Sequence, residues 1–375
     1  MIQITKTRFI LCLAGAFMVG ALIFGGAGAL MLSSNSSVIY GNDKLAEIQK
    51  NIDEYFLFDY QKKDLMDGMY KGYVSALDDP YSSYMNEKEF QSYIVTSSGD
   101  YFGVGIDFIV SKGKYLIIGV TKNSPAEEAG VEEGDYILAV DGVKYEDKDV
   151  MASKIRGEEG TEVTIKILHN KQKKDITMTR REIKKESVSY KMLDEDMAYI
   201  EINSFINNTS SDFEKALNAV SRNGAKSLVL DLRDNYGGLV DQSVAIADHF
   251  IDKGVVCYVK DKKGNTEKYE AKEGKTNLKT VVLINENSAS SSEILAAALK
   301  DNGYDIVGTK SFGKGVIQTT LTLKDGSALK LTVMKFLSPD KHIIHKKGIL
   351  PEYKVKDKPK TEEDEQLEKA KELLN

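Results

Sequence analysis

Two side chains in the C-terminal half of the chain have the types needed for acyl-transfer chemistry. Ser290 lies in the run Ser288-Ala289-Ser290-Ser291-Ser292-Glu293, and Lys314 lies between two glycines. A serine hydroxyl becomes a nucleophile when a neighbour takes its proton, and a lysine can do so if burial keeps its amine neutral. Gln318, four residues beyond Lys314, is placed to hold that amine by a hydrogen bond. The pattern predicts a serine hydrolase with a lysine base, a variant of the Ser-His-Asp triad.

Ser290 also has an ordinary structural explanation. Ser290 and Glu293 fit a capping box, which opens an apolar helix through reciprocal side-chain to backbone hydrogen bonds. The same helix end suits a nucleophile, because free N–H groups and the helix dipole favour negative charge there. Ser288, Ser291 and Ser292 compete with Ser290 for this role, and the run alone does not separate them.

Taken alone, Lys314 is most simply a solvated lysine in a loop, as most lysines are. Its glycine neighbours allow close backbone packing, however, and Phe312 is expected to supply apolar cover. Such burial disfavours the charged ammonium and lowers the lysine pKa. The sequence therefore predicts a partly buried Lys314, whereas Gln318 taken alone has the type of a surface strand residue.

A glycine pair after an apolar strand would supply further backbone donors. The run from Leu230 to Gly238 ends in Gly237-Gly238, and a helix is expected from about Val240. Glycines expose backbone N–H groups, which are the donors of an oxyanion hole. A tight strand-to-helix turn is the plainer explanation, and the run lacks the GxGxxG pattern of a dinucleotide-binding loop.

Composition excludes several classes of protein. The chain has 375 residues, enough for two or three domains, and a net charge of −6 that gives no electrostatic case for nucleic acid. Its two cysteines, Cys12 and Cys257, allow no disulfide framework, and Cys257 is expected to be buried and inert. The four histidines form no HExxH pattern, so we predict neither a metal nor another cofactor.

The N-terminal region predicts a membrane anchor. Phe9 to Leu32 is a run of 24 residues without a charge, long enough to cross a bilayer as a helix. Lys6 and Arg8 precede it, so the positive-inside tendency leaves the rest of the chain outside the cytoplasm. A cleaved signal peptide is the alternative, because Ala27-Gly28-Ala29 resembles a cleavage site.

Periodicity divides the remainder into three parts. Residues 43–93 show helical spacing, interrupted at Asp79-Pro80, and predict two or three packing or dimer helices to which no chemistry is assigned. Residues 101–181 predict short strands, the first over the alternating Phe102, Val104, Ile106 and Phe108, and from Met197 onward strands alternate with helices. This order predicts an α/β class, or α+β with a mixed sheet. The charged tail 358–375 predicts an amphipathic helix that packs on the body or on a partner.

A PDZ domain is indicated between these helices and the α/β part. In the run from Asn123 to Gly142, Ser124 and Pro125 predict a short capped helix, followed by a turn into a strand. The region resembles a PDZ domain of the bacterial protease-associated type. The resemblance implies that Phe102-Gly103-Val104-Gly105-Ile106 binds a peptide carboxylate through its N–H groups. It also implies that Arg156 couples peptide binding to catalysis.

Over residues 101–352 the chain resembles the carboxy-terminal processing peptidases, also called tail-specific proteases, of serine peptidase family S41. The resemblance rests on the Asp-Leu-Arg-x-Asn-x-Gly-Gly turn, the Ser-Ala-Ser-x-Ser-Glu-Ile run, the Phe-Gly-Lys-Gly-x-x-Gln run and the segment Gly348-Ile349-x-Pro351. The chain departs from the family pattern with Ser291 in place of alanine and Tyr236 in place of a frequent proline.

The resemblance assigns roles to the residues that match these motifs. Ser290 is then the nucleophile, Lys314 the general base and Gln318 the residue that orients it. The oxyanion hole is formed by the N–H of Ser291 and one from Gly237 or Gly238, a choice that the Tyr236 substitution leaves open.

These inferences predict a multidomain α/β or α+β protein. Its expected parts are a stub, transmembrane anchor and linker (1–36), a helical segment (37–96), a PDZ domain (97–183), a crotonase-like mixed α/β peptidase core (184–357) and a charged helix (358–375). The expected protein is a single-pass bacterial membrane endopeptidase whose extracytoplasmic part captures substrate C-termini. Its partners would be protein or peptide substrates, the membrane and, in a homodimer, a second copy. The alternatives are a catalytically silent PDZ scaffold and a crotonase-like acyl-transfer enzyme.

Overall fold

The computed structural model describes residues 42–98, 100–111, 113–145, 148–184, 186–272, 274–356 and 364–375. The chain divides into two units between Asp64 and Leu65, and helix α2 (Asn42–Tyr55) belongs to the first. In the described part of the chain, no helix combines the length and apolar character that a membrane span requires. The predicted anchor over Phe9–Leu32 lies outside the described residues.

The helices predicted over 43–93 are α2, α3 (Lys62–Ser75) and α4 (Glu87–Ser98). α3 ends at Ser75, ahead of the turn that contains Asp79-Pro80. Periodicity missed the short strand β1 (Ser83–Met85), which follows this turn. β1 pairs antiparallel with β17 (Ala328–Leu337), so Ser83–Met85 are joined to the α/β part by backbone hydrogen bonds.

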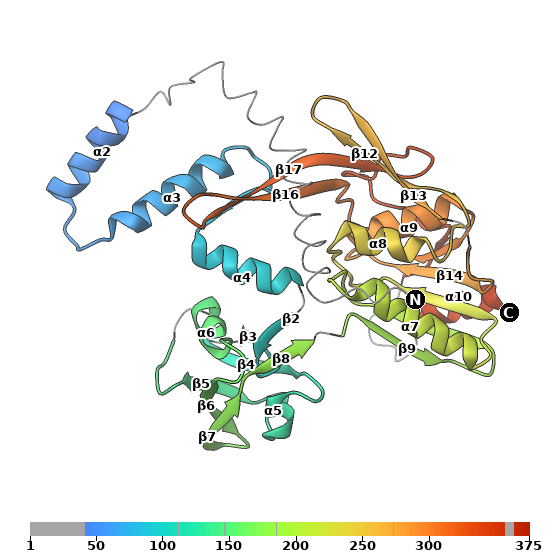
Figure 1. Ribbon diagram of the computed structural model, residues 1–375, viewed down its shortest axis with the longest axis horizontal. Helices are drawn as coiled ribbons and strands as arrows, with labels where there is room; N and C mark the ends of the chain where they lie inside the picture. Colours follow the sequence, from blue (N-terminus) through green and yellow to red (C-terminus); the bar gives the residue numbers. More distant parts are fainter. Residues whose placement is uncertain are drawn as a thin grey trace, which may run out of the picture. The chain divides into compact units, whose positions relative to one another are not determined.

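The region predicted as a PDZ domain is a small β-structure with two short helices (Figure 1). β2 (Asp100–Gly103) pairs with β8 (Arg181–Lys184). A five-stranded antiparallel sheet contains, in spatial order, β3 (Ile106–Ser111), β4 (Lys114–Val120), β5 (Tyr136–Val140), β6 (Glu162–His169) and β7 (Gln172–Thr179). Helices α5 (Pro125–Glu128) and α6 (Lys148–Ile155) complete it, and the Ser124 hydroxyl caps α5 as predicted.

One strand prediction in this region is wrong. The alternation from Phe102 to Phe108 predicted a continuous strand, but β2 ends at Gly103 and β3 begins at Ile106. Gly105 has φ +82° and its carbonyl accepts the N–H of Thr121, so the chain turns between the two strands.

The main sheet of the α/β part has six strands, and its central strands are the most deeply buried. Its spatial order is β18 (Tyr353–Lys354), β15 (Asp305–Gly308), β14 (Lys279–Ile284), β11 (Ser227–Asp231), β10 (Met197–Ile202) and β9 (Val188–Met192). All neighbours are parallel except β9. Every residue of β11 is buried, as expected for an apolar strand in a parallel sheet that is covered on both faces.

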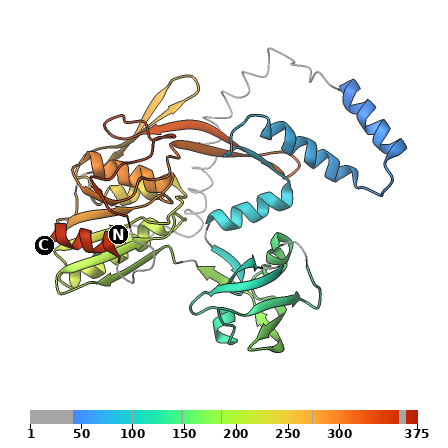
Figure 2. The same cartoon turned by 180° about the vertical axis from the view of Figure 1, so that it is seen from behind.

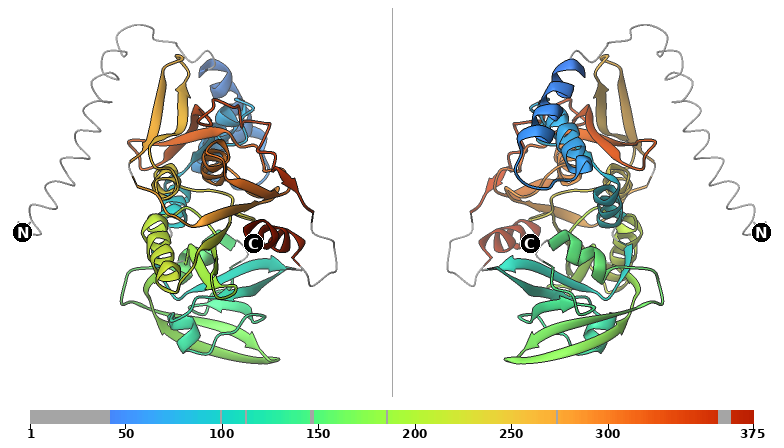
Figure 3. Two further views of the ribbon diagram at one scale, coloured as in Figure 1. Left: turned by 90° about the vertical axis from the view of Figure 1, so that its right-hand side faces the viewer. Right: turned by 90° about the vertical axis from the view of Figure 1, so that its left-hand side faces the viewer.

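Helices cover the two faces of this sheet in an unequal way. α7 (Thr209–Arg222), α8 (Val240–Ala247) and α9 (Ser291–Asp301) pack on the face that carries Leu228 and Leu230. α10 (Glu365–Leu374) packs on the opposite face, against Val229 (Figure 3). The predicted amphipathic tail therefore packs on the body of its own chain.

A second sheet is built around the long strand β17. β16 (Val316–Thr322) pairs along one side of β17 as a hairpin (Figure 2). β12 (Gly254–Asp261) and β1 also pair with β17, and β13 (Thr266–Ala271) pairs with β12. β16 begins two residues after Lys314 and carries Gln318, so this hairpin positions the predicted base and its partner.

Candidate active site

Ser290 occupies a strained position at the start of a buried helix. It is the N-cap of α9, with φ 55° and ψ −114°, a conformation that costs a non-glycine residue about 1–3 kcal/mol. The Glu293 carboxylate accepts the Ser290 N–H at 3.0 Å, as expected for the glutamate of a capping box. Backbone strain of this kind is common where a nucleophile must project from a sharp turn.

The other serines of the run are committed to structural hydrogen bonds. Ser288, Ser291 and Ser292 are fully buried, whereas Ser290 is partly exposed. Their hydroxyls donate to the backbone oxygens of Leu232, Gly238 and Asn235, at 2.7, 2.8 and 2.8 Å respectively. Within the described chain, the Ser290 hydroxyl donates to no acceptor. Of the four serines that the sequence left in competition, the structure leaves Ser290 as the one with a free proton.

The turn predicted to carry oxyanion donors lies directly against Ser290. Asn235 is fully buried and holds the turn by donating to the Ile202 carbonyl at 2.6 Å. Gly237 has φ +94°, and a Cβ atom there would lie 2.8 Å from the Ser290 Cβ and 2.9 Å from the Ser291 N. Only glycine allows this approach, because any side chain would collide with the serine.

The two glycines of this turn differ in what their N–H groups do. The Gly237 N–H donates to the Asn235 Oδ1 atom at 2.9 Å, so it is occupied. Neither the Gly238 N–H nor the Ser291 N–H has an acceptor among the described residues. Ser291 is the first residue of α9, where an unpaired N–H is expected.

Glu293 joins the serine to the lysine through one oxygen. Its Oε2 atom accepts the Ser290 N–H at 3.0 Å and the Lys314 N–H at 2.8 Å. Its Oε1 atom accepts the Ser311 hydroxyl at 2.6 Å and the Gly313 N–H at 2.7 Å. The two predicted catalytic residues are thus fastened to the same buried carboxylate, although they are twenty-four positions apart in the sequence.

Burial raises the pKa of Glu293, while its hydrogen bonds to Ser311, Gly313, Lys314 and Ser290 lower it and offset part of this rise.

The glycines beside Lys314 are required by close packing of the lysine loop. A Cβ on Gly315 would lie 2.2 Å from the His345 N, so the loop runs in contact with the segment that carries His345. The sequence flagged Glu293 as the capping-box glutamate, and its bond to the lysine loop was not predicted.

Lys314 is partly buried, and burial lowers its pKa, with a further lowering from the charge of Lys330. Its Nζ atom lies 4.9 Å from the centre of the Tyr81 ring. The prediction that Phe312 would cover the lysine is not supported by its exposure, since the Phe312 side chain is 55% exposed. Tyr81 is the aromatic residue over the ammonium, and burial raises its pKa, so its hydroxyl stays neutral.

The side chains of the predicted catalytic set have partners other than one another in the described chain. In the described chain no hydrogen bond joins Lys314 Nζ to Ser290 or to Gln318. The Gln318 amide donates instead to the Thr332 hydroxyl on β17, at 3.0 Å. Catalytic hydrogen bonds are often long before substrate binds, so this arrangement is compatible with a role for all three.

The turn from Asp79 to Ser82, in the segment to which the sequence assigned no chemistry, contacts this site. The Asp79 carboxylate accepts the Ser82 hydroxyl at 2.5 Å and the Tyr81 N–H at 3.2 Å. Ser82 in turn accepts the Thr332 N–H at 3.0 Å. These bonds place Tyr81 over Lys314. The signal in the sequence was the polar Asp79-Pro80-Tyr81-Ser82 turn, which interrupts the helical pattern.

A buried ion-pair network supports the glycine turn from behind. Arg233 donates to Asp231 at 2.6 Å and to Asp364 at 2.8 Å, and its side chain is 15% exposed. Tyr199 donates to the same Asp231 carboxylate at 2.7 Å. Asp364 caps α10 by accepting the Leu367 N–H at 2.9 Å. The Asp-Leu-Arg motif therefore anchors the C-terminal helix next to the turn, rather than taking part in the chemistry.

The predicted carboxylate-binding loop of the PDZ region has available donors. The N–H groups of Val104 and Gly105 have no acceptor among the described residues, whereas their carbonyls accept from Ala126 and Thr121. The Arg156 guanidinium lies 5.2 Å from the centre of the Tyr101 ring, beside this loop. Arg156 therefore lies close to the start of this loop, since its Cγ atom would be 3.8 Å from a Cβ atom on Gly103, and its coupling role stays a prediction.

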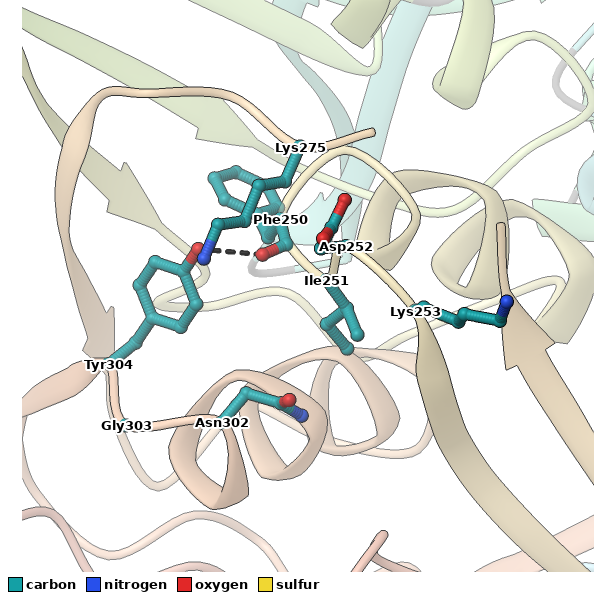
Figure 4. Close-up of a pocket in the computed structure, with 8 residues that line it drawn as sticks. All are labelled: Phe250, Ile251, Asp252, Lys253, Lys275, Asn302, Gly303 and Tyr304. Atoms are coloured by element: carbon teal, nitrogen blue, oxygen red, sulfur yellow. Dashed lines mark hydrogen bonds between the residues drawn. The ribbon is translucent and has the colours of Figure 1, made fainter. Parts of the chain in front are cut away.

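Two other features of the α/β part lie at the far end of α9, about 16 Å along the helix from Ser290. A pocket of about 240 Å³ (Figure 4) is lined by Phe250, Ile251, Asp252, Lys253, Lys275, Asn302, Gly303 and Tyr304. Asp301, Asp340 and His342 could together hold a cation, but exposed carboxylates commonly gather without one. We assign neither feature a role.

Cys257 is buried, and burial raises the pKa of its thiol to about 12, in keeping with the predicted inert thiol.

One buried carboxylate joins the serine at the start of α9 to the lysine loop, and the glycine turn packs against that serine. The same chain carries a PDZ-like sheet. Together these features define a serine peptidase with a peptide-binding domain. Comparisons with known proteins agree. Residues 196–355 match the model of peptidase family S41, residues 103–179 match the PDZ domain, and residues 31–89 match the N-terminal domain of the activating protease CtpB.

Relatives cover almost the whole chain. A Staphylococcus saprophyticus protein described as a "Probable CtpA-like serine protease" is 36% identical over 368 residues, which cover 95% of this chain and 74% of that protein. A Staphylococcus aureus protein with the same description is 37% identical over 373 residues, 96% of this chain and 74% of its own length. The solved photosystem II D1 C-terminal processing protease is 25% identical, with a TM-score of 0.51 over 83% of this chain and 86% of that one. The chain belongs to peptidase family S41, as a CtpA-like C-terminal processing serine protease with a PDZ domain.

Proposed function

We propose that Ser290 is the nucleophile of this protease, that Lys314 is its general base and that Gln318 orients the lysine amine. The observation that carries the proposal is the shared Oε2 atom of Glu293, which accepts the N–H groups of both Ser290 and Lys314. Both nitrogens lie within hydrogen-bond distance of one atom, so they are no more than about 6 Å apart. The four methylene groups of lysine span this separation easily.

The reaction follows from these positions. Neutral Lys314 takes the Ser290 proton as the hydroxyl oxygen attacks the peptide carbonyl. The negative charge that develops on the carbonyl oxygen is stabilised by the N–H of Ser291 and that of Gly238, the two donors without a protein acceptor. Lys314 then gives its proton to the leaving amine, and an acyl-enzyme remains on Ser290. A water molecule, deprotonated by Lys314, releases the acyl group.

Two side-chain movements would complete this arrangement. The Lys314 amine would leave the face of the Tyr81 ring and turn toward the Ser290 hydroxyl, and the Gln318 amide would exchange its Thr332 partner for the lysine. Both are rotations of side chains on backbones that Glu293 and the β16–β17 pairing hold in place.

The PDZ domain would capture the C-terminus of a protein substrate through the free N–H groups of Val104 and Gly105.

The uncharged run Phe9–Leu32 supports a membrane anchor that leaves the catalytic part outside the cytoplasm of a bacterial cell, with secretion after signal cleavage as the alternative. The segment after α2 exposes Tyr55, Phe56, Leu57 and Phe58, and these apolar side chains support a homodimer contact.

The test is cleavage of casein by the full chain in mild detergent. Ser290→Ala and Lys314→Ala should each lower kcat by several orders of magnitude, because residues that act as a unit fail together. Ser211→Ala on α7 and Lys324→Ala in the β16–β17 turn are matched controls that should retain activity, since both side chains are exposed. Full activity in Ser290→Ala or Lys314→Ala would refute the assignment.

A further inference from the structure

A large groove lies beside the lysine loop, on the β12 and β17 strands. Its volume is about 860 Å³. The floor includes apolar side chains of β17, among them Met334 and Phe336. Four lysines and a histidine belong to its lining: Lys260, Lys262, Lys335, Lys341 and His345.

The groove is strongly basic although the chain as a whole is acidic, with a net charge of −6. None of its four lysines forms an ion pair within the described residues, and all four are exposed. The only acidic side chain in the lining is Asp261, whose carboxylate accepts the side-chain and backbone N–H groups of Asn265 at 2.7 and 2.9 Å. The Nδ1 atom of His345 is buried without a hydrogen-bond partner in the described part of the chain. The lining therefore offers uncompensated positive charge and an unused polar atom.

Two contacts place this groove next to the catalytic residues. Thr332 lines the groove and accepts the hydrogen bond of Gln318 at 3.0 Å. His345 lines it too, and its backbone N would lie 2.2 Å from a Cβ atom on Gly315, the residue after Lys314. The next residue, Lys346, donates its N–H to the Gly313 carbonyl at 2.8 Å. If a peptide is held at Ser290 and Lys314, its residues on one side of the cleaved bond would thus lie within reach of the groove lysines.

We propose that this groove binds an acidic segment of the polypeptide substrate and gives the protease a preference for Asp or Glu near the cleaved bond. The apolar floor suits the aliphatic parts and backbone of an extended peptide, while the lysines around it match carboxylates. A peptide is favoured over other polyanions because the groove adjoins the site where a peptide is cut. The inference rests on the proposed roles of Ser290 and Lys314.

The experiment compares two casein-derived peptides that differ only in glutamate or glutamine at positions flanking the cleaved bond. Three groove lysines are changed together in one full-length variant: Lys260→Gln, Lys335→Gln and Lys341→Gln. A matched control removes the same charge from exposed lysines elsewhere in the α/β part: Lys324→Gln, Lys354→Gln and Lys356→Gln.

The unmodified chain should cleave the glutamate peptide with a kcat/KM about three- to tenfold above that of the glutamine peptide, since exposed charge pairs contribute modestly. The groove variant should lose this ratio, the control should keep it, and added salt should reduce it. Equal kcat/KM for both peptides in the unmodified chain would overturn the proposal.

A binding measurement separates this inference from the proposed catalysis. Fluorescence anisotropy of the labelled peptides on Ser290→Ala protein reports groove binding without cleavage. If the unmodified chain cleaves neither peptide, the assignment of Ser290 and Lys314 fails, and the anisotropy difference alone decides the groove. Equal binding of the two peptides, together with groove-dependent binding of phosphatidylglycerol vesicles, would replace the peptide with a lipid surface and refute the proposal.

Discussion

Replacing Glu293 with glutamine should uncouple the serine from the lysine while preserving shape. The carboxylate accepts four hydrogen bonds, two at each oxygen, in a site that is fully buried. A glutamine keeps one accepting oxygen and places an NH₂ group, which only donates, at the other position. If the oxygen stays with Ser290 and Lys314, the NH₂ group faces the Gly313 N–H, which loses its partner.

The magnitude follows from this count. The Ser311 hydroxyl can turn and accept from the new amide, so one buried N–H is left unsatisfied and the remaining bonds lose their charge. These losses should lower the free energy of unfolding by about 2–4 kcal/mol. Displacement of the Lys314 backbone should lower kcat about a hundredfold, because small misplacements of reacting groups are costly.

The pH profile distinguishes this role from simple loss of folding. The Glu293 charge is among the influences that raise the pKa of Lys314, so its removal lowers that pKa further. Activity that requires neutral lysine should then reach its plateau at a lower pH in Glu293→Gln than in the unmodified chain. The assay is kcat/KM for a casein peptide against pH, beside a thermal unfolding curve. A variant with unchanged stability, rate and pH profile would refute the reasoning.

Further predictions concern the surroundings of the lysine and the turn. In the unmodified chain, kcat/KM should rise with pH and level off above an apparent pKa that is below 10.5. Lys330→Gln should shift this rise in kcat/KM to higher pH, because it removes a charge that lowers the pKa of Lys314. A rise at the same pH in both proteins would contradict this prediction. Tyr81→Leu should lower kcat/KM by changing how the amine is held, with little effect on peptide binding by the PDZ domain; equal loss of both would point to general damage. Gly237→Ala should abolish labelling by serine reagents, since its methyl group would lie 2.8 Å from the Ser290 Cβ, and retained labelling would show that the turn can yield. Arg233→Met should lower the unfolding temperature by leaving the buried Asp231 without its partner and by releasing Asp364, and an unchanged temperature would count against the network.

Most elements were predictable because their signals are local. The β5 strand and the start of α9 are set by apolar runs bounded by turn residues and by a capping serine. Among the strands that were missed, β1 and β13 depend on pairing with β17 and β12, which no local pattern reveals. The break between β2 and β3 was hidden because Val104 and Ile106 continue an alternating pattern across Gly105.

The candidate site was likewise predictable in part: the features that depend on local sequence were found, and those that depend on distant residues were not. The types and spacing of Ser290 and Lys314 indicated their chemistry, but not which of the four serines had a free hydroxyl. That distinction depends on carbonyls of the glycine turn, more than fifty residues away. The contact of Tyr81 with Lys314 spans more than two hundred residues, and only the turn that makes it possible was visible in the sequence.

The central claim is that Ser290 acts as a nucleophile activated by Lys314. It is tested most directly by treating the full chain with a fluorophosphonate reagent and locating the adduct by mass spectrometry. The account predicts one adduct, on Ser290, that is lost in Lys314→Ala and retained in Lys324→Ala. An adduct on Ser288, Ser291 or Ser292, or labelling of Ser290 that persists without Lys314, would contradict it.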